Sequence, residues 1–130
     1  MVLPCLYELA KNRCHFIAEN QQYNNPKSKL DGAYLIYDNE EKHIYYNREY
    51  DFNGGRERVG MGVLIAKYLQ NHDDEVLLNS LKKYIKYVQK NLVCIETGEV
   101  FNDCNYDNSF TRLYNYPWFS LFYIELYKLL

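Results

Sequence analysis

Apolar side chains recur along the chain at spacings close to the period of an α-helix, and they do so in four separate segments. The first segment, residues 4–20, predicts a helix with one buried stripe. The polar run "ENQQYNNPKSK" follows and ends it, because Asn, Pro and Ser favour turns. The apolar positions of this first helix are Leu6, Leu9, Ala10, Cys14, Ile17 and Ala18.

Two of the other segments are apolar on nearly every side, which predicts helices buried among their neighbours. One covers residues 55–71 and contains "VGMGVLIAKYL". The other covers residues 117–130 and begins with Pro117, a residue favoured at a first helical position. Gly60 and Gly62 weaken the former helix, and we expect them to allow the close approach of a neighbouring backbone.

The remaining helical segment, residues 74–92, is amphipathic and therefore half exposed. Asp73 or Asp74 is suited to be its N-cap. Its lysines lie opposite an apolar stripe formed by Leu77, Leu78, Leu81, Tyr84, Ile85, Val88 and Leu92.

Residues 32–50 have a different pattern, in which "AYLIY" and "HIYYN" flank the polar "DNEEK". This arrangement predicts a small β-hairpin with a long turn. The fold class is therefore all-α, with antiparallel helical hairpins and a small β-hairpin insertion.

The four helices follow the order half exposed, buried, half exposed, buried. Since consecutive helices run antiparallel, the second and fourth should point the same way. We expect their N-terminal ends to open on one face of the molecule, where loops 48–58 and 101–118 meet.

Composition and charge limit the function without specifying it. The 130 residues suit one domain, and 48% hydrophobic with 25% charged residues is typical of a folded protein. Fifteen tyrosines indicate large contact surfaces. A net charge of −2 gives no basic field for nucleic acid. We expect no signal peptide and no membrane span, which makes the cytoplasm the default location.

The cysteines and acidic residues do not form a metal-binding pattern, and we expect no cofactor. Cys5 and Cys14 lie about 13 Å apart along one helix, too far to bond. Cys94 and Cys104 flank a turn and could bridge in an oxidising compartment, but reduced core thiols are the favoured interpretation. "NYDN", residues 105–108, lacks the glycine and distal Glu of a calcium loop.

The first candidate site is "RER" in "NGGRERVG", at the start of the second helix. Arg56 and Arg58 are unfavourably placed beside the positive end of the helix dipole. A bound anion such as a uronate carboxylate would offset their charges. The favoured alternative is a local clamp in which Glu57, or another acidic residue, pairs with an arginine; the other candidates are Glu49, Asp51, Asp103 and Asp107.

The second candidate site is "RLYNYPW", which leads into the fourth helix. Its aromatic residues could stack on sugar rings, while Arg112 and Asn115 fix hydroxyls or a carboxylate. The alternative is packing in the core beside Pro117, which is the favoured interpretation of Trp118. The aromatic residues of this site are Tyr114, Tyr116 and Trp118.

"GGRERVGMGVLIAKYL" and "RLYNYPWFSLFYIELYKL" resemble the last two hairpins of bacterial (α/α) toroid domains of the six-hairpin glycosidase and polysaccharide lyase type, exo-rhamnogalacturonan lyases among them. The resemblance implies a partial toroid over residues 1–130 that acts on or binds acidic, pectin-like polysaccharide by β-elimination or hydrolysis. A complete toroid has more hairpins, so it also implies a fragment, or a module completed by self-association or by the remainder of a larger chain. No catalytic residue can be carried over. The alternative function is a non-catalytic helical module that binds a partner chain through a tyrosine-rich surface.

Overall fold

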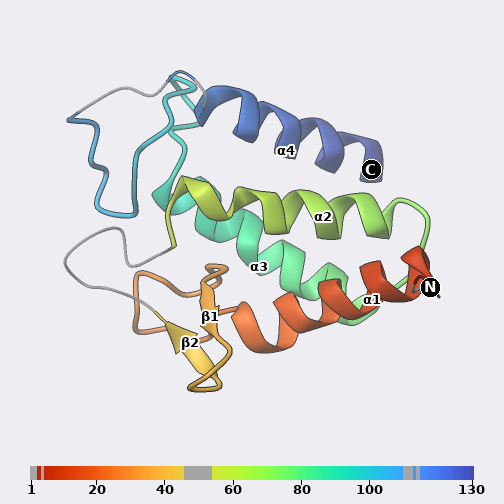
Figure 1. Ribbon diagram of the computed structural model, residues 1–130. Helices are drawn as coiled ribbons and strands as arrows, with labels where there is room; N and C mark the ends of the chain where they lie inside the picture. The colour runs from red at the N-terminus through yellow and green to blue at the C-terminus, as the bar shows by residue number, and fades with distance from the viewer. Residues whose placement is uncertain (1–2, 4, 46–53, 110–112, 114) are drawn as a thin grey trace.

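The computed structural model describes residues 3, 5–45, 54–109, 113 and 115–130 (Figure 1). It is mostly helical and has one small antiparallel sheet. The α-helices are α1 (Leu6–Phe16), α2 (Val59–Leu69), α3 (Glu75–Asn91) and α4 (Asn115–Leu129). The strands are β1 (Ile36–Asp38) and β2 (His43–Tyr45). This composition of elements confirms a helical fold with a hairpin insertion.

Helix α2 is central and contacts each of the other three helices. In Figure 1, α1 lies below it, α4 lies above it and α3 lies behind. Helices α1 and α3 run opposite to α2 and α4, so α2 and α4 are parallel and begin on the same side of the molecule (Figure 1). The parallel course expected for the second and fourth helices is therefore observed.

The helix boundaries follow local sequence signals. The Asp74 side chain caps α3 by accepting a hydrogen bond from the Leu77 amide at 3.0 Å. A π-helical turn, Ile17–Gln21, extends the first helix, and a 3-10 turn, Arg56–Arg58, precedes α2. Helical structure thus covers almost all of the predicted segments 4–20 and 55–71.

The predicted β-hairpin is confirmed in its described part. Strands β1 and β2 pair with Ile36 opposite Tyr45 and Asp38 opposite His43. An Asp38 carboxylate oxygen accepts hydrogen bonds from the amides of Glu40 and Glu41, which closes the polar turn. Residues 46–50 of the predicted segment lie outside the described residues.

Stacked tyrosines fill the centre of the core. The Tyr34 and Tyr84 rings stack with centroids 4.2 Å apart, and Tyr84 also contacts the Phe122 ring edge to face. The Tyr87 hydroxyl donates a hydrogen bond to the Gly54 carbonyl. Part of the tyrosine excess therefore serves packing and is not a contact surface.

Two expectations about burial are wrong. Leu6 and Leu9 of α1 are exposed, because α1 has neighbours on one side only. Helix α4 is buried only along the face that meets α2, and its outer face exposes Leu121, Ile124, Tyr127 and the following Leu130. An apolar sequence shows which faces prefer burial, but not whether another element covers them.

The glycines of α2 also differ from the expectation. A Cβ atom at Gly62 would lie 2.7 Å from both the Phe122 and the Tyr84 rings, so side chains and not a backbone approach it. A Cβ atom at Gly60 would meet nothing within 4 Å. The expectation of close approach is therefore wrong for Gly60, which borders open space.

All four cysteines carry free thiols. Cys14 and Cys104 are buried, as expected for reduced core residues, whereas Cys5 is exposed and Cys94 is half-buried, so the core expectation is wrong for these two. Within the described residues, no group of three or more His, Cys, Asp or Glu side chains could hold a metal ion. In the same part of the chain, every helix is too short or too polar to cross a membrane.

Candidate functional site

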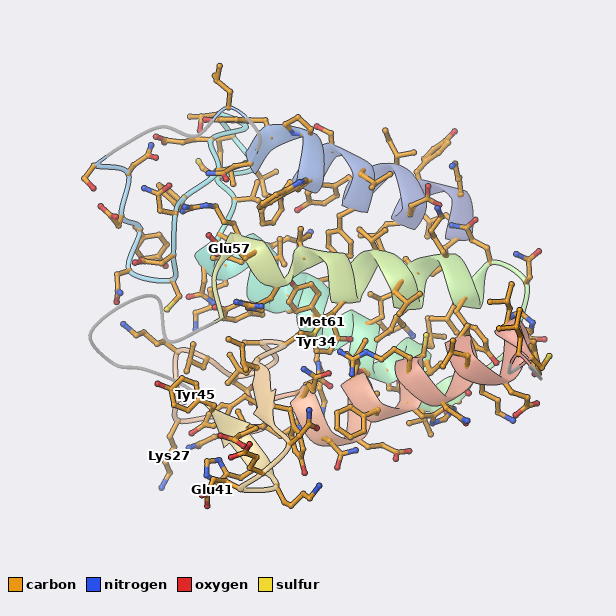
Figure 2. The ribbon with its side chains drawn as sticks, in the orientation of Figure 1. Lys27, Tyr34, Glu41, Tyr45, Glu57 and Met61 are labelled. Carbon is orange, nitrogen blue, oxygen red and sulfur yellow. The ribbon has the colours of Figure 1, made fainter. Side chains whose placement is uncertain are left out.

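A hollow of about 170 Å³ lies between the N-terminal ends of α2 and α4. Because these helices are parallel and adjacent, residues about sixty positions apart in the sequence meet there (Figure 1). Figure 2 shows Glu57 at the beginning of α2. The residues that line the hollow are Glu57, Val59, Gly60, Val63, Trp118 and Leu121.

Trp118 forms one wall of this hollow, and its side chain is 38% exposed. The interpretation that placed Trp118 in the core is therefore wrong. The side chain that follows on α4, Phe119, is the one that enters the core. Gly60 lines the same hollow from α2 and has no side chain to fill the space in front of the indole.

Arg56 is neutralised within the chain. Its guanidinium is 3.4 Å from a Glu57 carboxylate oxygen, and the residue is buried. Its charge also helps to hold the pKa of Asp107 below the usual range, although the main cause of that shift is the Ser109 amide that donates to the Asp107 carboxylate. The local clamp predicted from "RER" is thus present, and it offsets one of the two cations at the start of α2.

Arg58 is placed differently. Within the described residues its buried Nε has no hydrogen-bond partner. Burial strongly raises the pKa of the nearby Tyr84, and the positive charge of Arg58 acts against that shift. The buried hydroxyl of Tyr84 also lacks a partner in this part of the chain, as does the Oδ1 atom of Asn115 at the start of α4. Unsatisfied buried polar atoms are rare, so their presence at this end of the molecule suits a ligand or ordered water.

The other predicted site residues are only partly described. Tyr116 is 38% exposed in the first turn of α4, and Asn115 beside it is buried. Arg112 and Tyr114 lie outside the described residues. The structure therefore brings together Glu57 and Trp118, with Arg58 and Asn115 at the starts of the same two helices.

Four residues of the hollow were not predicted: Val59, Gly60, Val63 and Leu121. Helical spacing could have found three of them. Glu57, Gly60 and Val63 follow one another at three-residue intervals, and Leu121 lies three residues after Trp118. Residues three apart share a helix face, so each predicted residue already indicated its neighbours.

The aspartates that precede this site in the loop shape the backbone. One Asp103 carboxylate oxygen accepts from the Asn105 amide at 2.6 Å, and one of Asp107 accepts from the Ser109 amide at 3.0 Å. The Asn102 amide donates to the Asp107 carbonyl. "NYDN" thus forms turns of the kind that Asp and Asn side chains commonly close.

No family model matches this chain, and no curated protein matches it either. A solved structure described as a polysaccharide lyase is similar to it with a TM-score of 0.84 and 33% sequence identity. The likeness covers 98% of this chain and 19% of that lyase chain, so this chain spans about a fifth of its length. The similarity establishes the fold of nearly the whole chain and links it, in general terms, to carbohydrate-active proteins.

Proposed function

We propose that the hollow between α2 and α4 binds one sugar ring of an acidic, pectin-like polysaccharide. The observation that carries the proposal is the half-exposed indole of Trp118, which faces a space left open by Gly60 and bordered by the Glu57 carboxylate. The similarity to a polysaccharide lyase over almost the whole chain supports a saccharide as the ligand.

Each side chain has a chemical role in this proposal. The flat apolar face of Trp118 packs against the C–H face of a sugar ring. The Glu57 carboxylate accepts hydrogen bonds from sugar hydroxyls, which are donors. At about 170 Å³ the hollow is smaller than the sites that hold drug-sized ligands, so it suits a single ring of a longer chain.

The preference for an acidic sugar comes from the ends of the two parallel helices. The N-terminal ends of both helix dipoles place partial positive charge on one side of the molecule. Arg58 adds a full charge there, whereas Arg56 is already paired with Glu57. A uronate carboxylate facing this side would therefore be favoured over a neutral hydroxymethyl group.

The function proposed for this chain is binding. Cleavage by β-elimination needs a base that removes a proton beside the uronate carboxylate and a cation that neutralises that carboxylate. We assign no residue to the first role, and we propose that the cleavage reaction, elimination or hydrolysis, belongs to a complete toroid.

The experiment uses Trp118 as its own reporter, since it is the only tryptophan of the chain. We expect galacturonate oligosaccharides to change its fluorescence at concentrations where neutral galactose oligosaccharides do not. Arg58→Ala should weaken binding about tenfold, the effect of losing one charged hydrogen bond. Amide NMR shifts should map the bound sugar to the starts of α2 and α4.

A matched control keeps the test specific. Trp118→Ala should abolish the NMR shifts caused by the sugar, while Tyr127→Ala, which removes an exposed aromatic ring from the other end of α4, should leave them unchanged. Shifts that map elsewhere, or a Trp118→Ala variant that binds like the wild type, would contradict the proposal.

The second candidate function is a non-catalytic helical module that binds a partner chain. The apolar outer face of α4 favours it, because exposed apolar patches mark interaction surfaces. Exposed tyrosines also remain beside the buried ones, namely Tyr7, Tyr45, Tyr106, Tyr116 and Tyr127.

A further inference from the structure

An apolar groove of about 960 Å³ lies between α3 and α4, away from the saccharide hollow. The end of α2 contributes Leu69 and Gln70 to it. Most of the remaining lining is aliphatic or aromatic, including Leu78 and Ile85 of α3 and Tyr123, Leu126 and Leu130 at α4.

The two walls of the groove have the spacing that receives a helix. On α3, lining residues occur at positions 75, 78, 81, 82, 85 and 89, and on α4 at positions 123 and 126–129, with residue 130 just after the helix. Steps of three and four residues keep side chains on one helix face. Two such rows that border a groove form the holes into which the side chains of a third helix pack.

A second unpartnered apolar surface lies on α1. Leu6 is 80% exposed and Leu9 is 53% exposed, while Cys14 on the same helix is buried in the core. Leu3, just before the helix, is exposed as well. In Figure 1, α1 and α4 lie on opposite sides of α2. Tyr7 and His15 of α1 contact His72 and Asp74 at one end of the groove. Leu6 and Leu9 do not line the groove of their own chain.

We propose that the groove between α3 and α4 receives α1 of a second copy of this chain, joined head to tail. Within one chain, α3 packs against both α1 and α2. The groove offers the corresponding place beside α3 and α4. An incoming α1 would therefore lie against α3 and α4 in the same way that α3 lies against α1 and α2. Its Leu6 and Leu9 would fill the holes of the groove.

Charge complementarity supports this occupant. Where α3 begins, the groove is bordered by Asp73 and Glu75, both exposed. Helix α1 begins after Cys5, which provides no side-chain cap, and the one acidic side chain of its first turn is Glu8. If the incoming α1 runs parallel to α3, as the two do within one chain, its positive end lies beside these carboxylates.

The contact is heterologous, because each copy contributes two different surfaces. This property allows a sharp test by sedimentation velocity and light scattering of the chain without saccharide, from about 10 µM to 1 mM. The wild-type chain should show a mass that rises with concentration. Leu9→Glu on the α1 surface and Tyr127→Glu on the groove should each remain monomeric, since a buried unpaired carboxylate opposes association.

The decisive sample is an equimolar mixture of the two variants. A Leu9→Glu copy keeps its groove and a Tyr127→Glu copy keeps its α1 surface, so the mixture should form dimers and nothing larger. The matched control is Ile124→Glu on α4, an exposed position that does not line the groove, and this variant should associate like the wild type. Circular dichroism should show that every variant is folded.

Three outcomes would overturn the proposal. The first is a wild-type chain that stays monomeric at 1 mM. The second is a mixture that stays monomeric although the wild type associates, because the contact would then be isologous. The third is that the Leu9→Glu variant associates while the Tyr127→Glu variant, measured separately, stays monomeric. The groove would then hold a segment other than α1. The saccharide site takes no part in these measurements, so its failure would be seen separately.

Discussion

At the scale of single residues, two buried tyrosines of similar surroundings differ in one hydrogen bond. The Tyr34 hydroxyl lies 2.9 Å from the hydroxyl of Ser80, and both residues are buried. The Tyr84 ring stacks on Tyr34, but its hydroxyl has no hydrogen-bond partner within the described residues. A buried polar group stabilises a fold only when its bonding capacity is used, so the two hydroxyls should have opposite effects.

Tyr34→Phe should lower the free energy of unfolding by about 1 kcal/mol, because it leaves the Ser80 hydroxyl buried and unpaired. Tyr84→Phe should leave it unchanged or raise it by up to about 1 kcal/mol, because it removes an unsatisfied group. Urea unfolding of the two variants measures the difference when both show the same dependence of the free energy of unfolding on urea concentration. An equal loss in both would show that Tyr84 has a stabilising partner, such as an ordered water.

His15 gives the fold a pH dependence near neutrality. Burial lowers its pKa, but hydrogen bonds to the carboxylates of Glu19 and Asp74, at 3.2 and 2.8 Å, together with their charges, raise it above the ordinary value overall. A pKa raised by folding stabilises the protein fully below the unfolded value of about 6.5. That contribution is lost as the pH rises through the folded value.

The free energy of unfolding should therefore fall between pH 6 and pH 8 in the wild-type chain. His15→Gln should flatten this dependence, because glutamine does not titrate, while His43→Gln, at an exposed position, should retain it. Denaturant titrations at several pH values measure the slope. A slope that persists in His15→Gln would assign the dependence to another group.

At the scale of elements, α2 contains two glycines that are alike in sequence and opposite in setting. Gly62 lies under the Phe122 and Tyr84 rings, where α2 meets α4 and α3, and Gly60 borders the open hollow. Both weaken the helix through backbone entropy, by about 1 kcal/mol relative to alanine. Only at Gly62 does close packing with the neighbouring helices require the missing side chain.

Gly60→Ala should stabilise the chain by up to about 1 kcal/mol, since the added methyl group meets no atom within 4 Å. Gly62→Ala should destabilise it by about 1–3 kcal/mol, because a Cβ atom 2.7 Å from two rings forces them apart and outweighs the gain in helix propensity. Thermal unfolding monitored by circular dichroism compares the variants directly. A stabilised Gly62→Ala would mean that the rings move aside readily.

The elements themselves were predictable because their signals are local. Apolar periodicity identified all four helices. A carboxylate before an apolar run predicted Asp73 or Asp74 as a cap, and Asp74 is the residue that caps α3. Exposure was not predictable, because it depends on what covers a face. The same periodicity that correctly placed Cys14 in the core wrongly placed Leu6 there, and the apolar run around Trp118 wrongly suggested that its indole is covered.

At the scale of the whole molecule, the candidate site follows from one topological property. The parallel course of α2 and α4 could be inferred from the order of the helices, and it brings Glu57 and Trp118 to one hollow. The pairing of Arg56 with Glu57 was among the alternatives that the sequence left open, and only side-chain geometry decides between them. The groove was not predictable as a site, since its walls come from faces that the sequence indicates only as apolar.

The separation of hollow and groove gives a last prediction about stability. An association that exists only between folded copies stabilises the folded state by mass action, so the melting temperature should rise with protein concentration. Above the dissociation constant, each tenfold increase contributes up to about 1.4 kcal/mol per dimer, or a shift of roughly 2–4 °C. Differential scanning calorimetry of the wild-type chain at several concentrations measures this rise.

The melting temperature of Tyr127→Glu should not depend on protein concentration, because its groove is blocked. The melting temperature of Trp118→Ala should still rise with concentration, although this variant loses saccharide binding. A Trp118→Ala variant with a constant melting temperature would show that the two surfaces are not independent, and that association also involves the hollow.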